Sequence, residues 1–158
     1  MKKIICICAL MFIMFFLSAC ITVDVNFKLS QSKTNITSID IYEVDSVYDH
    51  GNVHNLKEEN QPIYTITSSK QEQFIKEIES LKYEKEIILF PIPMDGGLNL
   101  TGYAIVISYQ NGGYDIIGYD GFFSYKLKEN GEERYSYDYS NYCGDEPWDS
   151  VIWKYINK

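Results

Sequence analysis

The chain has 158 residues and a formal net charge of −8, with 46% apolar and 23% charged residues. This length predicts one domain, and the apolar fraction excludes a wholly disordered chain. The acidic balance argues against nucleic-acid binding, because a protein that binds a phosphate backbone needs a basic face.

The N-terminus has the pattern of an export signal. Two lysines precede an apolar run over 4–17, and small residues then lead to Cys20. Positive charge at such a start is retained on the cytoplasmic side of the membrane. At about 1.5 Å per residue the run is too short to cross a hydrocarbon core of about 30 Å comfortably. The pattern therefore predicts a signal peptide over 1–19.

The segment Leu17-Ser18-Ala19-Cys20 resembles the lipobox of bacterial lipoprotein precursors. The resemblance covers only the first 20 residues. It implies that the Cys20 thiol receives a diacylglyceryl group, and that cleavage between Ala19 and Cys20 makes the lipidated residue the mature N-terminus. The alternative is an ordinary signal peptide or a transmembrane anchor with a chance cysteine. No comparable apolar run follows Cys20 as a stop-transfer segment.

Loss of the signal would change the charge and the cysteine content of the chain. Two lysines and no acidic residue would be removed, so the net charge would move from −8 to −10. An anionic leaflet repels such a body. We therefore expect residues 20–35 to be a lipidated N-terminus and tether. Cys143 would be the one free thiol, so no disulfide is expected within the mature chain.

The composition indicates a source and a location. The chain is rich in Ile, Lys, Asn and Tyr and has a single arginine, which is typical of AT-rich genomes. In this respect it is similar to lipoproteins of low-GC Gram-positive bacteria. That similarity implies a lipid anchor on the extracytoplasmic face of the cell membrane.

Residues 36–158 predict a single α+β domain. Strands are expected over 36–47 and 63–67, with a polar connection over 48–60. Residues 21–35 read as linker, with a short alternating strand over 21–27 as the competing interpretation. A helix is expected over 70–83, because an apolar stripe follows what reads as a capping box, formed by Ser69 and Glu72. The stripe consists of Phe74, Ile75, Ile78 and Leu81.

The second half of the chain predicts an antiparallel meander. Residues 101–109 are apolar at both parities, which predicts a central strand covered on both faces. Glycine-rich turns separate it from the strands that follow. A C-terminal helix over 146–156, capped by Asp145, is expected to pack with the first helix on the sheet. The other expected strands are 86–90, 114–119, 122–127 and 135–140.

Two groups of residues have the chemistry of metal ligands. His50 and His54 are four residues apart, but the Gly-Asn pair between them favours a turn over a zinc-binding helix. The stretch over 95–99 supplies oxygen ligands beside glycines, as calcium loops do, without the full EF-hand pattern. A solvated turn is the alternative interpretation. The calcium candidates are Asp95, Asn99 and Asp120, with Asp115 and Asp138 as residues that could converge on them.

No familiar catalytic motif is present. Cys143 is a lone thiol, and its only candidate bases are the two distant histidines. The sequence contains no nucleophile elbow, Walker loop or dinucleotide fingerprint. No catalytic residue and no cofactor are therefore expected.

The chain is unusually rich in tyrosine, with 14 of them. Tyr135, Tyr137 and Tyr139 alternate, so on a strand they share one face. An exposed stripe of this kind stacks on sugars or peptides. The alternative is a half-buried sheet face in a chain whose codon usage favours tyrosine.

Together these features favour a lipid-anchored extracytoplasmic binding module for a protein or cell-wall component. Two other functions stay open. One is a small envelope hydrolase that uses clustered carboxylates such as Asp95, Asp115 and Asp120. The other is a surface immunity lipoprotein, whose negative charge would steer a basic toxin or inhibitor.

Overall fold

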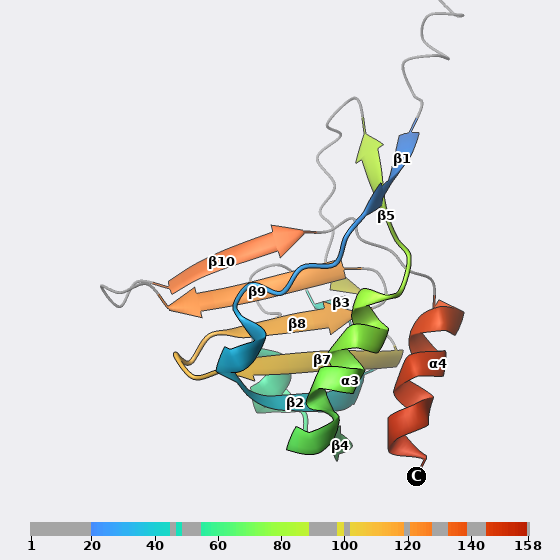
Figure 1. Cartoon of the computed structure of the whole chain (residues 1–158). Helices are drawn as coiled ribbons and strands as arrows, with labels where there is room; N and C mark the ends of the chain where they lie inside the picture. Colours follow the sequence, from blue (N-terminus) through green and yellow to red (C-terminus); the bar gives the residue numbers. More distant parts are fainter. Residues whose placement is uncertain are drawn as a thin grey trace, which may run out of the picture.

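The computed structural model describes residues 20–44, 47–48, 55–88, 98–99, 102–118, 121–127, 133–138 and 145–157 (Figure 1). Within these residues, six strands form one antiparallel sheet in the order β10-β9-β8-β7-β2-β4. The strands are β2 (Ile36–Val44), β4 (Tyr64–Thr65), β7 (Gly102–Tyr109), β8 (Tyr114–Gly118), β9 (Gly121–Leu127) and β10 (Glu133–Asp138). The predicted α+β class and the meander from β7 to β10 are both confirmed.

Strand β7 lies at the centre of the sheet, between β8 and β2. Ile105 is paired with Ile41 on one side and with Ile117 on the other. Residues 104–107 are fully buried whichever face they point to. The prediction of a central strand covered on both faces is therefore confirmed.

Two helices cover one face of the sheet (Figure 1): α3 (Ser68–Glu79) and α4 (Asp145–Ile156). Phe74 of α3 meets Tyr155 of α4 edge-to-face, with ring centroids 4.9 Å apart. The apolar stripe of each helix faces the isoleucines of β2, β7 and β8, as the helical spacing predicts. The core of this layer includes Ile39, Ile41, Ile105, Ile107, Ile117, Phe74, Ile75, Ile78, Trp148, Val151 and Ile152.

The limits of α3 differ from the prediction of 70–83. Thr67 is the N-cap, with an extended backbone at φ −61° and ψ 146°, so Ser69 is already inside the helix. The predicted capping box is therefore wrong, and Glu72 pairs instead with Lys76 at 2.8 Å. The helix ends at Glu79, where the Ser80 hydroxyl donates to the carbonyl of Glu77 at 2.7 Å.

The other face of the sheet carries a second, smaller core. Its centre is Leu56 of α2 (Leu56–Glu59), a fully buried side chain in the segment predicted to be a polar connection. The predicted strand 36–47 ends earlier, at Val44, and β3 (Val47–Tyr48) lies across its predicted boundary with the connection. β3 pairs with β6 (Leu98–Asn99) in a separate small sheet. The second core contains Tyr42, Val44, Leu56, Ala104, Val106, Ile116 and Phe123.

The first described residues form a strand. β1 (Cys20–Val25) pairs antiparallel with β5 (Tyr83–Ile88), from Cys20 opposite Ile88 to Val25 opposite Tyr83. This two-stranded ribbon extends away from the main sheet (Figure 1). The competing interpretation of 21–27 as a short strand is therefore correct over most of its length.

The residues that follow β1 pack onto the body of the domain. Phe27 stacks on Tyr83, with ring centroids 5.7 Å apart, and Leu29 belongs to the main core. The backbone N–H of Ser30 donates to Asp115 at 2.9 Å, and the 3₁₀ helix η1 (Lys33–Asn35) then leads into β2. The interpretation of residues 20–35 as a tether is therefore wrong, because paired backbone and buried side chains make them part of the domain.

Candidate binding surface

The tyrosine stripe lies on the outermost strand of the meander. Tyr135 is opposite Tyr125, and Tyr137 is opposite Phe123. Directly opposed positions share a face of the sheet, so both tyrosine positions belong to the face that carries the second core around Phe123. Tyr139 lies outside the described residues.

Asp115 is one of the carboxylates proposed for calcium binding or hydrolysis. Its side chain is 3% exposed, in β8. One of its oxygens accepts hydrogen bonds from the Ser30 N–H and from the Tyr109 hydroxyl. Asp115 therefore joins segment 27–31 to the sheet. Asn99 lies in β6, opposite Val47, while Asp95 and Asp120 lie outside the described residues.

Asp138 is the last residue of β10, opposite Phe122. His50, His54 and Cys143 lie outside the described residues. In the part of the chain that the structure describes, no three His, Cys, Asp or Glu side chains come together as a metal site. Across the same residues, no helix has the length and apolar character needed to span a membrane. Cys20 is the first residue of β1.

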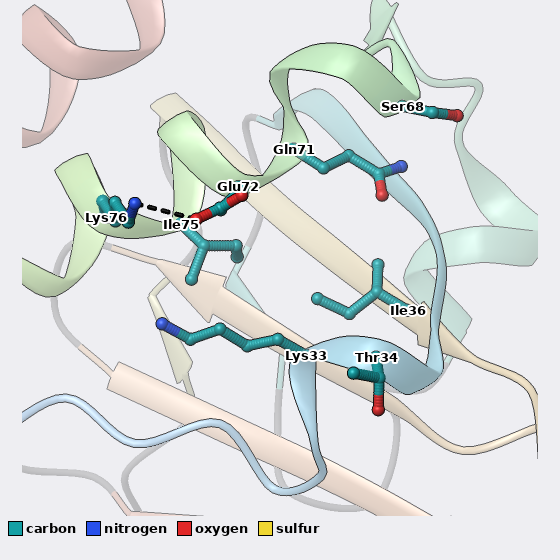
Figure 2. Close-up of a pocket in the computed structure, with 8 residues that line it drawn as sticks. All are labelled: Lys33, Thr34, Ile36, Ser68, Gln71, Glu72, Ile75 and Lys76. Carbon is teal, nitrogen blue, oxygen red and sulfur yellow. Dashed lines mark ion pairs between the residues drawn. The ribbon is translucent and has the colours of Figure 1, made fainter.

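A groove of about 410 Å³ lies between η1 and the first half of α3 (Figure 2). Ile36 and Ile75 supply its apolar lining. Lys33 is paired with Glu79 at 2.6 Å, and Lys76 with Glu72 at 2.8 Å. Because both ammonium groups already have carboxylate partners, the groove offers little uncompensated charge to a ligand. Its other lining residues are Thr34, Ser68 and Gln71.

A more distinctive surface lies where α4 crosses the beginning of β7. Trp153 is 50% exposed, and its ring meets Tyr103 edge-to-face with centroids 6.3 Å apart. Glu43 of β2 is paired directly with Tyr103, and Asp149 precedes Trp153 by one turn of α4. We call these four residues the aromatic–acidic patch.

The environment of the patch raises the pKa of the Tyr103 hydroxyl. Burial, followed by the negative charges of Glu43 and Asp149, raises the pKa of Tyr103 above its ordinary value. The Tyr103 hydroxyl therefore keeps its proton at neutral pH. The exposed Glu43 carboxylate beside two aromatic rings matches the side chain of lysine or arginine, which gains both an ion pair and a cation–π contact.

Buried neighbours hold the patch in place. The indole N–H of Trp148 donates to the carbonyl of Tyr103 at 2.8 Å, and the Trp148 ring is fully buried. This bond fastens α4 to β7 at Tyr103, the residue whose ring Trp153 contacts. The other large apolar side chain exposed in the described residues, Ile63, is 46% exposed and lies beside β2 at the start of β4.

No family model, curated protein sequence or solved structure matches the chain.

The patch did not emerge from the sequence, although one signal pointed to it. Trp153 falls outside the stripe that α4 buries, which runs through Trp148, Val151, Ile152 and Tyr155. A large aromatic on the outer side of an amphipathic helix is unusual enough to mark a surface. The pairing of Tyr103 with Glu43, by contrast, depends on the register of β2 and β7, which local patterns do not specify.

Proposed function

We propose that the protein is a lipid-anchored extracytoplasmic lipoprotein that binds a basic protein partner through the aromatic–acidic patch. The observation that carries the anchor is the sequence Leu17-Ser18-Ala19-Cys20, which resembles a lipobox and follows a lysine-led apolar run.

The exposed pairing of Trp153 with Tyr103 supports the binding role. The half-exposed ring of Trp153, beside the partly buried Tyr103, offers apolar contact area, and Glu43 supplies a charge that attracts a cation. The acidic net charge of the whole chain favours the same partners, because it accelerates their encounter with the surface. A basic toxin or inhibitor, as an immunity lipoprotein would bind, is one form of this partner.

Direct chemical evidence tests the anchor. We expect mass spectrometry of the mature protein to find residue 20 as the N-terminus, with its sulfur carrying a diacylglyceryl group. Cys20→Ser should release the protein from the membrane fraction, and the matched control Cys143→Ser should leave it there. An unmodified residue 20, or retention of residues 1–19, would remove the proposal of a lipid anchor.

Photo-crosslinking in intact cells tests the binding surface. A benzoylphenylalanine at position 153 should yield a crosslink to a protein with a basic surface, whereas the same group at position 63 should not. Asp149→Lys should weaken the crosslink at 153 about tenfold, since it replaces attraction by repulsion. The control is Glu58→Lys on α2, which makes the same change of charge away from the patch and should leave the crosslink at 153 unchanged. Identical products at 153 and 63, or no product at 153, would contradict the assignment.

A further inference from the structure

We infer that the β1–β5 ribbon is a rigid spacer, called here the stand-off. Its far end contacts the lipid surface, and it holds the acidic body away from the membrane. The inference rests on the proposed attachment of lipid at Cys20. It assigns a second interaction surface, whose partner is the outer leaflet of the bilayer.

The register gives the ribbon an apolar far end and a charged middle. Cys20 is opposite Ile88 and Ile21 is opposite Ile87, so the far end is formed by two pairs without charge. Charged residues enter at the next pairs along the ribbon, which are Thr22 with Glu86, Val23 with Lys85 and Asp24 with Glu84. The residue proposed to carry the lipid thus lies at the apolar end.

The opposite end of the ribbon is fixed to the domain. Tyr83 is buried, and its hydroxyl donates to the carbonyl of Ile78 at 2.9 Å. Its ring packs against Phe27 and against Phe122, with centroids 5.7 and 5.2 Å away. Because the base is tied to the core, the ribbon has a defined direction relative to the sheet, and that direction leads away from it (Figure 1).

Ion pairs add to the stiffness just above this base. The Lys82 ammonium lies 3.2 Å from Asp24 on β1 and 2.7 Å from Glu84 on β5. One cation therefore connects the two strands through their carboxylates. A ribbon closed in this way transmits the position of its tip to the body better than the flexible linker expected from the sequence would.

The length of the ribbon is matched to the range of the electrostatic repulsion. Five residue steps at about 3.4 Å each separate Cys20 from Val25 by about 17 Å. The Debye length at physiological salt is about 8 Å. The acidic body is thus about two screening lengths from an anionic leaflet when the ribbon stands upright, and within one when the molecule lies flat. Repulsion therefore favours the upright orientation.

Quenching by brominated lipid tests this orientation. The lipidated full chain would be reconstituted in vesicles of phosphatidylcholine and phosphatidylglycerol, with and without bromine on the acyl chains. Ile88→Trp should lose at least twice as much fluorescence to the brominated lipid as the matched variant Asp24→Trp, which lies near the base. Ile21→Trp, on the partner strand, should show the same quenching as Ile88→Trp. It replaces Ile88→Trp in the comparison if that variant does not fold.

Equal quenching at positions 88 and 24, or none above the level of the unmodified chain, would overturn the stand-off. Mass spectrometry and vesicle flotation of the same samples separate this failure from failure of the anchor. A chain that carries lipid at Cys20 and floats, yet shows equal quenching, refutes the orientation alone. A chain without lipid that does not float refutes both proposals.

Discussion

Asp115 on β8 accepts a hydrogen bond from the hydroxyl of Tyr109 on β7, and the pair is enclosed in the main core. The same carboxylate oxygen accepts the backbone N–H of Ser30, which is 85 positions away in the chain. Asp115 is the one charged side chain that is buried among the described residues. Its two hydrogen bonds connect the N-terminal segment to the hairpin at the centre of the sheet.

Replacing this carboxylate should destabilise the domain. Asp115→Ala leaves both the Ser30 N–H and the Tyr109 hydroxyl without an acceptor, and we expect a loss of about 2–4 kcal/mol in the free energy of unfolding. Asp115→Asn keeps an acceptor oxygen and should cost less. Urea denaturation measures both, with Glu58→Ala, which removes an exposed carboxylate on α2, as the control. Equal losses for the Asn and Ala variants would show that the hydrogen bonds are not the cause.

Alkaline pH should destabilise the fold through its buried tyrosines. Burial, then the charge of Glu77 and its hydrogen bond, raises the pKa of Tyr155 to about 12 from 10.0. Burial and Asp115 likewise raise the pKa of Tyr109. Above pH 10 the unfolded chain therefore loses these protons first, and stability falls as the pH rises towards 12.

The Tyr155→Phe variant isolates this effect. Between pH 10 and 12 its free energy of unfolding should fall less steeply than that of the unmodified protein, as measured by urea denaturation at several pH values. Trp153→Phe changes an aromatic on the same helix without removing an ionisable group, and should keep the original slope. A Tyr155→Phe profile parallel to that of the unmodified protein would contradict the prediction.

Glu77 should contribute to stability at neutral pH and lose that contribution in acid. Burial raises the pKa of Glu77, but hydrogen bonds from Lys154 and Gln73 outweigh it and leave the pKa below 4.5. The Lys154 ammonium is 3.0 Å away, and the Tyr155 hydroxyl 3.2 Å, so the carboxylate joins α3 to α4. Its stabilisation is therefore present above pH 4.5 and disappears as the pH falls.

We expect Glu77→Gln to cost about 0.5 kcal/mol at pH 7, because the ion pair is partly exposed to solvent. The difference from the unmodified protein should shrink below pH 4.5. Thermal unfolding at pH 7 and pH 3.5 checks both points. Glu72→Gln breaks the exposed pair with Lys76 and should leave the melting temperature unchanged. A constant difference at the two pH values would show that the charge of Glu77 is not responsible.

The second core should contribute to the stability of the domain, although its helix α2 is only one turn long. Leu56→Ala removes a fully buried side chain between α2 and the sheet, and we expect a loss of about 2–5 kcal/mol. Glu58→Ala, exposed on the same helix, is the control for any change in helix propensity. A loss below about 1 kcal/mol for Leu56→Ala would indicate that α2 does not seal this face of the sheet.

Sequence patterns identified the elements whose signals are local. Strand β7 was predictable because residues 104–107 are apolar at every position, and α4 because its stripe repeats at helical spacing. The pairing of β1 with β5 was not, since nothing near Cys20 specifies a partner more than 60 positions later. For the same reason segment 27–31 was mistaken for a linker.

The candidate site followed the same division. Tyr103 and Trp153 are visible in the sequence as aromatic residues, but their contact joins β7 to α4 across the fold. Asp115 was grouped with Asp95 and Asp120 as a carboxylate that could converge with them, because the sequence gives no indication that segment 27–31 covers it. The sequence thus shows the chemical type of each residue, but it does not show which residues lie close together in the fold.

The bond from Ser30 to Asp115 also constrains when the molecule can fold. The ribosome synthesises Ser30 long before Asp115, with 84 residues between them. The earliest part of the body to be made is therefore among the last to find its contacts, and loop closure of this size slows folding. Segment 27–31 therefore stays without this partner in the growing polypeptide until Asp115 has been translated.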